Sequence, residues 1–171
     1  EDKEEWRPVL ELLNGVPLKQ ITLHPRIGKQ QYKGEVDMEA FQAFYETCKH
    51  PLLYNGDVMT LGDIQQLEKT YPRLAGVMIG RGLLARPSLA AEYKEGRERS
   101  WKERRTQLME MHERLKAHFE GIVNSDAQLH SKLRLFWEYM ETEIERKAYK
   151  KLMKSGNLKN YLAAVQEIGR I

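Results

Sequence analysis

Residues 51–57 read Pro-Leu-Leu-Tyr-Asn-Gly-Asp, a short apolar run that ends in a polar turn, and this stretch decides the fold class. Two other stretches have the same form: Ile-Thr-Leu-His-Pro-Arg at residues 21–26 and Gly-Val-Met-Ile-Gly-Arg-Gly at residues 76–82. Apolar runs of this length, bounded by glycine, proline and polar residues, are typical of buried β-strands. We therefore expect three short strands in the first half of the chain.

Helical patterns fill the intervals around these predicted strands. Before the first strand, apolar residues at helical spacing end at Asn14-Gly15, a helix-stop signal. Between the first two strands, Asp37 can cap a helix, and Thr60 with Asp63 forms a capping box that opens another helix after the second strand. Strands that alternate with helices at this spacing predict an α/β fold with a parallel sheet.

Beyond Gly96 the sequence pattern changes from alternating strands and helices to helices alone. Three apolar stripes at helical spacing run from Leu108 to Ile122, from Leu129 to Leu152 and from Leu158 to Ile168. They predict an all-helical module of three helices, with Trp137 in its core. The predicted domains are therefore residues 1–95 and residues 96–171.

Composition and charge exclude several classes of protein. The 171 residues are 41% hydrophobic and 31% charged, and no apolar run approaches the roughly 20 residues of a spanning helix. A single cysteine, Cys48, excludes an internal disulfide framework, and no histidine pair has the spacing of a helical zinc site. We expect a cytoplasmic protein that holds no metal and does not associate with membranes.

Charge is divided unevenly between the two halves. Residues 1–85 hold 10 Lys and Arg against 12 Asp and Glu, whereas residues 86–171 hold 18 against 13. A basic second half favours contact with a polyanion. Its strongest feature is a run of lysines with no acidic residue between Glu145 and Glu167. The run consists of Lys147, Lys150, Lys151 and Lys154, followed by Lys159. It is either a stripe that contacts phosphates or a solvated helix face.

The ends of the three predicted strands carry polar and glycine-rich motifs. These are His24-Pro25-Arg26, Asn55-Gly56-Asp57 and Gly80-Arg81-Gly82. Ligands of parallel α/β folds bind at the carboxyl ends of strands, and glycine lets the backbone approach a phosphate. Each motif alone is typical of a tight turn, but their succession on neighbouring strands predicts a phosphate site.

Taken together, these motifs resemble the later half of a tRNA-dihydrouridine synthase. The similarity covers essentially the whole chain, including the helical tail that this family carries after its barrel. The residues that carry it are the three strand-end motifs, the apolar runs before them, and Gln30, Tyr32, Gly34 and Pro87.

The resemblance implies the later part of a TIM barrel, about three parallel strands, in an FMN-dependent enzyme that reduces uridine in tRNA, with NADPH or NADH as electron donor. It implies that FMN is held by His24, Asn55, Gly56, Asp57, Gly80 and Arg81. It further implies that Arg26 contacts either the substrate or the loop above the flavin, and that the helical module binds the tRNA through residues that include Lys147, Lys150, Lys151 and Lys154.

The resemblance also implies that part of the enzyme is missing. The family's catalytic cysteine and its flavin-contacting lysine lie in the first half of the barrel, so no catalytic residue is expected in this chain. Cys48 is expected to be a packing residue. The chain alone is then an inactive fragment, and either the first half of the barrel or a second chain would cover its open sheet edge.

Two other functions remain open at this point. One is a non-catalytic RNA-binding or interaction module that keeps a half-barrel and a basic helical tail. The other is a flavin barrel reductase with a small-molecule substrate.

Overall fold

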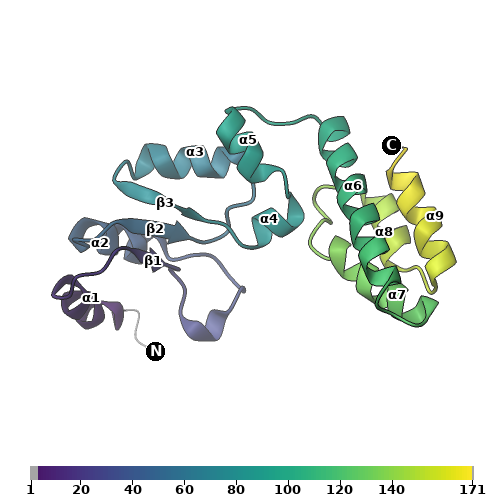
Figure 1. Cartoon of the computed structure of the whole chain (residues 1–171). Helices are drawn as coiled ribbons and strands as arrows, with labels where there is room; N and C mark the ends of the chain where they lie inside the picture. The colour runs from purple at the N-terminus through teal and green to yellow at the C-terminus, as the bar shows by residue number, and fades with distance from the viewer. Residues whose placement is uncertain (1–3, 171) are drawn as a thin grey trace. The chain divides into compact units, whose positions relative to one another are not determined.

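The computed structural model of the protein describes residues 4–170. The chain forms two compact units, one ending at Gly80 and the other beginning at Arg81 (Figure 1). The first unit contains a β-sheet with helices, and the described part of the second unit contains helices alone. Within residues 4–170, no helix is both long and apolar enough to cross a membrane.

The sheet of the first unit has three parallel strands in the order β1-β2-β3. They are β1 (Ile21–Leu23), β2 (Leu52–Asn55) and β3 (Leu74–Met78). Leu23 lies opposite Tyr54, and Asn55 lies opposite Met78, so the carboxyl ends of the strands share one edge. The predicted α/β fold with three parallel strands, the later part of a TIM barrel, is confirmed.

Helices connect the strands where the sequence predicts them. They are α1 (Trp6–Asn14), α2 (Met38–Thr47) and α3 (Leu61–Thr70), with the 3₁₀ turn η1 (Gly28–Gln30) in the β1–α2 loop. The Asp37 carboxylate accepts a 2.9 Å hydrogen bond from the backbone N–H of Ala40. Thr60 and Asp63 form the predicted capping box at the start of α3. Both caps satisfy backbone donors that a first helical turn leaves unpaired.

Aromatic rings form the core of the first unit. Phe41 of α2 is fully buried, and its ring contacts Tyr54 and Tyr71 edge-on, with centroids 4.9 and 5.0 Å away. Tyr45, one turn further along α2, is also buried, and its hydroxyl accepts a 2.8 Å hydrogen bond from the backbone N–H of Arg73. These contacts fix α2 against the sheet and so fix the loops at the strand ends.

The second unit consists of helices of very different lengths. They are α4 (Arg81–Ala85), α5 (Leu89–Glu95), α6 (Trp101–Glu120), α7 (Asp126–Arg134), the 3₁₀ turn η2 (Leu135–Trp137), α8 (Arg146–Met153) and α9 (Leu158–Ile168). Arg81 and Gly82, predicted to lie in a turn, instead begin the short helix α4.

The prediction of one continuous helix from Leu129 to Leu152 is wrong. The helical structure stops after η2 and resumes at α8, yet Met140 and Ile144 of the intervening segment remain buried. The side chain of Glu145 accepts hydrogen bonds from the backbone of residues 147 and 148, so it caps a new helix rather than continuing an old one. The apolar period persists across the break because the irregular segment also faces the core.

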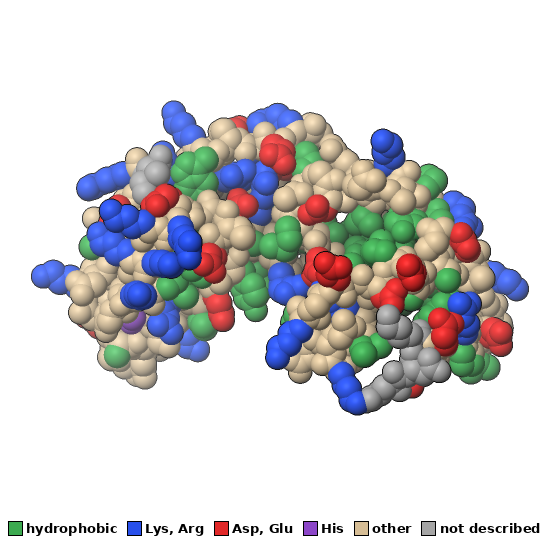
Figure 2. Space-filling view, turned by 180° about the vertical axis from the view of Figure 1, so that it is seen from behind, with side chains coloured by type: hydrophobic (Ala, Val, Ile, Leu, Met, Phe, Trp, Pro, Cys, Tyr) green, Lys and Arg blue, Asp and Glu red, His purple; other side chains and the backbone are tan. Residues whose placement is uncertain are grey.

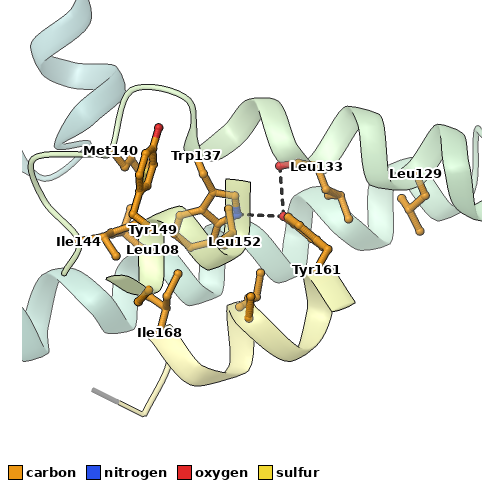
Figure 3. Close-up of a cluster of buried hydrophobic side chains, with 13 residues drawn as sticks. Leu108, Leu129, Leu133, Trp137, Met140, Ile144, Tyr149, Leu152, Tyr161 and Ile168 are labelled. Carbon is orange, nitrogen blue, oxygen red and sulfur yellow. Dashed lines mark hydrogen bonds between the residues drawn. The ribbon is translucent and has the colours of Figure 1, made fainter. Parts of the chain in front are cut away.

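The core of the helical bundle is mainly apolar and includes a buried polar cluster around the Tyr161 hydroxyl (Figure 3). Trp137 is fully buried, as predicted, and its indole Nε1–H donates a 2.8 Å hydrogen bond to the hydroxyl of Tyr161. That hydroxyl donates to the carbonyl of Leu133 at 3.2 Å. Fully buried His112 of α6 places its Nε2 atom 2.7 Å from the same hydroxyl.

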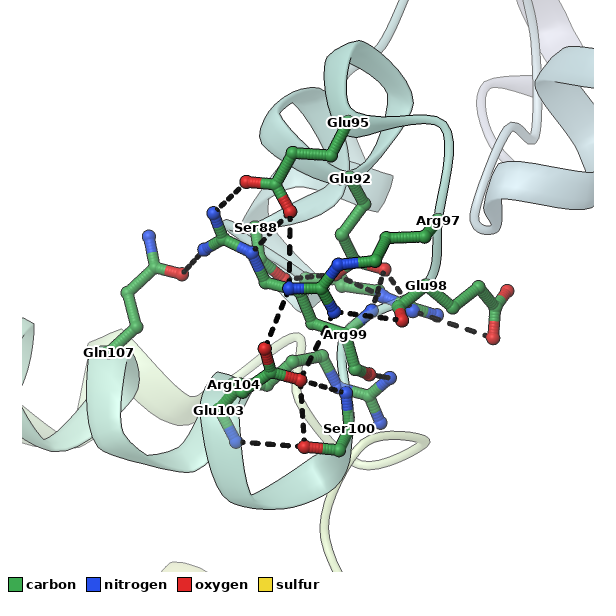
Figure 4. A network of polar contacts seen from close by, with 11 residues as sticks. Ser88, Glu92, Glu95, Arg97, Glu98, Arg99, Ser100, Glu103, Arg104 and Gln107 are labelled. Carbon is green, nitrogen blue, oxygen red and sulfur yellow. Dashed lines mark hydrogen bonds and ion pairs between the residues drawn. The ribbon is translucent and has the colours of Figure 1, made fainter.

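Glu92 is the centre of a buried polar network that links α5 to the residues before it and to the segment before α6 (Figure 4). The carboxylate of Glu92, which is 0% exposed, pairs with Arg86 and also accepts from the Ser88 hydroxyl and the Arg99 backbone N–H. Burial raises the pKa of Glu92, but these hydrogen bonds outweigh it and the pKa is lowered overall.

This network ties α5 to the start of α6, and both α4 and α5 fall within the second unit, whereas the sequence pattern places a domain boundary at residues 95 and 96. The separate functions expected for the two predicted domains stay predictions.

Candidate functional site

The carboxyl ends of the three strands are tied together by hydrogen bonds. His24 directly follows β1, and its Nδ1 atom lies 2.7 Å from the backbone carbonyl oxygen of Asn55, the last residue of β2. The side-chain amide of Asn55 donates a 2.7 Å hydrogen bond to the carbonyl of Met78, the last residue of β3. The structure therefore brings His24 and Asn55 together at one sheet edge, with Gly80 two residues beyond the end of β3.

The contact with Asn55 also determines the tautomer of His24. A carbonyl oxygen only accepts hydrogen bonds, so the proton of the neutral imidazole lies on Nδ1. The Nε2 atom then carries a lone pair and is a hydrogen-bond acceptor. His24 is half-buried, so this acceptor is held by a fixed ring at the sheet edge.

The two glycines at the strand ends have different roles. A Cβ atom on Gly56 would lie 2.6 Å from the Tyr54 hydroxyl and 2.9 Å from a Val36 methyl carbon, so local packing requires glycine there. Tyr54 is itself buried, and burial raises its pKa to about 12. A Cβ atom on Gly80, by contrast, would meet nothing within 4 Å among the described residues. The backbone at Gly80 is therefore open to approach by a ligand.

Arg26 and Asp57 form an ion pair that sequence reasoning did not foresee. The Arg26 guanidinium contacts both carboxylate oxygens of Asp57 and donates a 2.7 Å hydrogen bond to the carbonyl of Gly34. The hydrogen bond to Asp57 raises the pKa of Arg26. Its side chain is 2% exposed. Opposite charges at the ends of two neighbouring parallel strands were the signal that could have revealed the pair.

This pair bears on two predicted roles. The contact of Arg26 with substrate stays a prediction, but the guanidinium is already directed at protein acceptors. The side chain of Asp57 is likewise engaged by Arg26, which leaves backbone groups of this turn as the means of holding an anion.

A cavity of about 880 Å³ lies beside β1 and was also missed by sequence reasoning. Three separate segments line it: the start of α1, the end of β1 with the β1–α2 loop, and α2 as far as Phe44. Trp6 and Phe44, whose rings lie 5.6 Å apart, belong to its wall. Figure 2 shows a hollowed face of the first unit on which hydrophobic side chains gather. No local pattern indicates such a cavity, because its walls come from residues far apart in the chain.

The predicted lysine stripe lies on the exposed side of α8. Ala148, Tyr149 and Leu152 face the core, whereas the four lysines are exposed: Lys147, Lys150, Lys151 and Lys154. Lys151 pairs with Glu167 of α9, and this hydrogen bond lowers the pKa of the Glu167 carboxyl. The four lysines therefore form a basic surface in which the charge of Lys151 is paired with Glu167 of the neighbouring helix.

Two further kinds of candidate site are the single cysteine and clusters of metal-ligating side chains. Cys48 is half-buried at the end of α2, and its Sγ atom contacts the carbonyl of His50 at 3.6 Å. In the part of the chain that the structure describes, no three His, Cys, Asp or Glu side chains are grouped so that they could hold a metal ion.

Comparison with known proteins adds independent information. A family model described as dihydrouridine synthase matches residues 2–168. A probable tRNA-dihydrouridine synthase of Rhizobium leguminosarum bv. phaseoli is 42% identical over 67 residues, which are 39% of this chain and 21% of the relative. A probable tRNA-dihydrouridine synthase of Aquifex aeolicus is 30% identical over 98 residues, 57% of this chain and 30% of the relative.

A longer match comes from a yeast protein. The tRNA-dihydrouridine(20a/20b) synthase [NAD(P)+] of Saccharomyces cerevisiae is 28% identical over 148 residues, 85% of this chain and 36% of the relative. The chain thus spans between about a fifth and about a third of the length of these three relatives. Because the family model matches nearly all of its residues, the chain belongs to the dihydrouridine synthase family.

Proposed function

We propose that this chain is part of an FMN-dependent oxidoreductase that reduces uridine to dihydrouridine in tRNA. The observation that carries the proposal is the hydrogen-bonded link from His24 through Asn55 to Met78, which joins three consecutive strand ends. In a parallel α/β fold this edge is where ligands bind. The names of the relatives supply the substrate class.

The residues at this edge fit a flavin phosphate. The open backbone at Gly80 leaves room for an anion, and Arg81, the next residue, is the charged partner that we propose for it. Backbone groups of Asn55, Gly56 and Asp57 would complete the cradle. His24 would approach the flavin ring with its fixed Nε2 acceptor. When bound, FMN supplies the hydride that reduces the 5,6 double bond of uracil.

The electron donor that we propose is NADPH or NADH. The name of the yeast relative includes NAD(P)+, which supports this class of donor. We assign no catalytic acid to this chain. The residues described above bind and orient; the proton for the second carbon of the uracil double bond comes from elsewhere in the enzyme.

The proposed partner is tRNA, contacted through the basic surface of α8. Its exposed lysines can neutralise backbone phosphates without reading bases. The exposed apolar surface of the first unit and the outer edge of β1 would be covered by the remaining barrel strands or by a second chain, because parallel sheets are normally buried. A tRNA-modifying enzyme of this kind is expected in the cytoplasm.

A chimeric enzyme tests the proposal most directly. This chain would replace the matching segment of the Aquifex aeolicus relative, and dihydrouridine would be measured in tRNA by mass spectrometry. We expect activity in the chimera and its loss on His24→Ala. A folded, FMN-loaded chimera that leaves uridine unreduced contradicts the proposal.

Flavin titration tests the cofactor assignment separately. In the chimera, Arg81→Ala should weaken FMN binding by roughly 1.5–3 kcal/mol, because one charge-assisted contact is lost. Unchanged affinity contradicts the assignment of Arg81. The chain alone should bind FMN weakly. If it binds tRNA but the chimera binds no flavin, the non-catalytic RNA-binding function is favoured instead.

A further inference from the structure

The β1–α2 loop, residues 24–37, is a closed and internally bonded loop. At its base the backbone N–H of Asp37 donates a 2.8 Å hydrogen bond to the carbonyl of Pro25. Within it, the side chain of Gln30 accepts from the Ile27 N–H at 3.1 Å, and the Gln30 N–H returns a 3.0 Å bond to the Ile27 carbonyl. Loops with close ends and internal bonds hold one shape well.

This shape nonetheless includes strained backbone. Gln31 has a φ of 50° and Gly34 a φ of 72°, both in the left-handed region. For Gln31, which has a Cβ atom, such a φ is unfavourable. Strained residues persist only where surrounding contacts hold them in place.

Arg26 supplies such contacts from within the loop. One of its terminal nitrogens, Nη2, donates to the carbonyl of Gly34, three residues after the strained Gln31, at 2.7 Å. Both terminal nitrogens contact the carboxylate of Asp57, which lies in the loop after β2. The Arg26 guanidinium therefore fastens the β1–α2 loop to the neighbouring strand end, and it is 98% buried while doing so.

We propose that Arg26 and Asp57 form a latch that holds the β1–α2 loop in position at the sheet edge. Arg26 is then a positioning residue and not a ligand of substrate phosphate. The loop carries exposed Lys29 and Lys33. The latch thus determines where these two positive charges meet an RNA backbone, a consequence that rests on the proposed function.

Two measurements on the 171-residue chain test the latch. The first is hydrogen–deuterium exchange of residues 27–36 in the wild type, Arg26→Gln, Asp57→Asn and the double variant. We expect either substitution to speed exchange there by at least about threefold, and the double variant to match the single ones. Lys69→Gln, an exposed charge change on α3, is the matched control and should leave exchange in the loop unchanged.

The second measurement is tRNA affinity over a salt series. A latch predicts that Arg26→Gln and Asp57→Asn both weaken binding by a similar factor and leave the salt slope unchanged. A direct phosphate contact predicts the opposite pattern: Arg26→Gln lowers the slope by about 0.7–0.9, and Asp57→Asn strengthens binding by releasing the guanidinium. That second pattern, or unchanged exchange in residues 27–36, overturns the latch.

These readouts separate the latch from the proposed function. If the wild type does not bind tRNA, the proposed partner is contradicted while the exchange data still decide the latch. If Arg26→Gln unfolds the first unit, Arg26→Lys replaces it: lysine keeps the charge but lacks the two-pronged geometry. Faster exchange in residues 27–36 with an unchanged melting temperature supports the latch, and unchanged exchange contradicts it.

Discussion

The indole of Trp137 donates a 2.8 Å hydrogen bond to the hydroxyl of Tyr161, and both side chains are fully buried in the helical bundle. The hydroxyl has one proton, which goes to the Leu133 carbonyl. The Nε2 atom of His112, 2.7 Å away, must therefore donate to the same oxygen. One hydroxyl thus satisfies polar atoms from three segments.

Removing this hydroxyl should destabilise the protein strongly. Tyr161→Phe leaves the Trp137 N–H and the His112 Nε2 atom without their shared partner, whereas the Leu133 carbonyl still accepts from the Leu135 N–H. Each unsatisfied buried group costs about 1–3 kcal/mol. We expect the free energy of unfolding to fall by about 2–4 kcal/mol in urea denaturation. Tyr139→Phe, at a 44% exposed position, is the control and should change it little. Equal effects would show that the buried cluster contributes no stability.

The buried His112 should make stability depend on pH. Burial lowers its pKa from the ordinary 6.5, against the opposing influence of Glu113, whose carboxylate lies 3.7 Å from Nδ1. Below pH 6.5 the unfolded chain then binds more protons than the folded one, so the free energy of unfolding falls as pH falls.

Denaturation from pH 5 to 8 measures this effect. The fall should be smaller in His112→Gln than in the wild type, whereas His118→Gln, at an exposed histidine of the same helix, should follow the wild type. Parallel curves for all three proteins would contradict this role of His112.

The Arg86–Glu92 pair should be far more sensitive than its exposed neighbours. Glu92→Gln removes the buried counter-charge of the Arg86 guanidinium and leaves it only the exposed carboxylate of Glu98, 3.7 Å away. Removing one partner of a buried ion pair typically costs about 3–5 kcal/mol. Glu95→Gln removes an exposed partner of Arg99 and should leave the free energy of unfolding nearly unchanged. Thermal and urea unfolding of the two variants check the contrast; similar losses would mean that burial of the pair is unimportant.

The two strand-end glycines should respond oppositely to alanine. Gly56→Ala places a methyl group against Tyr54 and Val36 and should lower stability by about 1–3 kcal/mol. Gly80→Ala should fold normally, because the space around it is open, but should weaken FMN binding in the chimera. Melting temperatures and flavin titrations of both variants provide the check. Full flavin affinity in Gly80→Ala would argue against close approach of the phosphate to this residue.

The basic surface of α8 should account for the salt dependence of tRNA binding. Each neutralised phosphate adds about 0.7–0.9 to the slope of log affinity against log salt. The test replaces four lysines with alanine: Lys147, Lys150, Lys151 and Lys154. This quadruple substitution should lower the slope by roughly two to four units. Circular dichroism should show unchanged helicity, since alanine is a strong helix former. An unchanged slope would mean that the lysines form only a solvated face.

The sequence by itself determined the elements of the first unit. Apolar runs, the caps at Asp37 and Thr60, and the stop at Gly15 are short-range signals, so the three strands and their helices could be located from them. The strand-end motifs likewise indicated which residues share one edge, because parallel strands end together. His24 and Asn55 meet there as a consequence.

Only the tertiary structure decided the remaining features. The pairing of Arg26 with Asp57 joins residues 31 positions apart, and the shared hydroxyl of Tyr161 joins α9 to His112, 49 positions away. Periodicity carries no information about such distant partners. It also failed at the break before α8, because buried Met140 and Ile144 keep the apolar pattern in backbone that is not helical. Periodicity reports which side chains face the core, whereas the path of the backbone depends on which long-range contacts satisfy its polar groups.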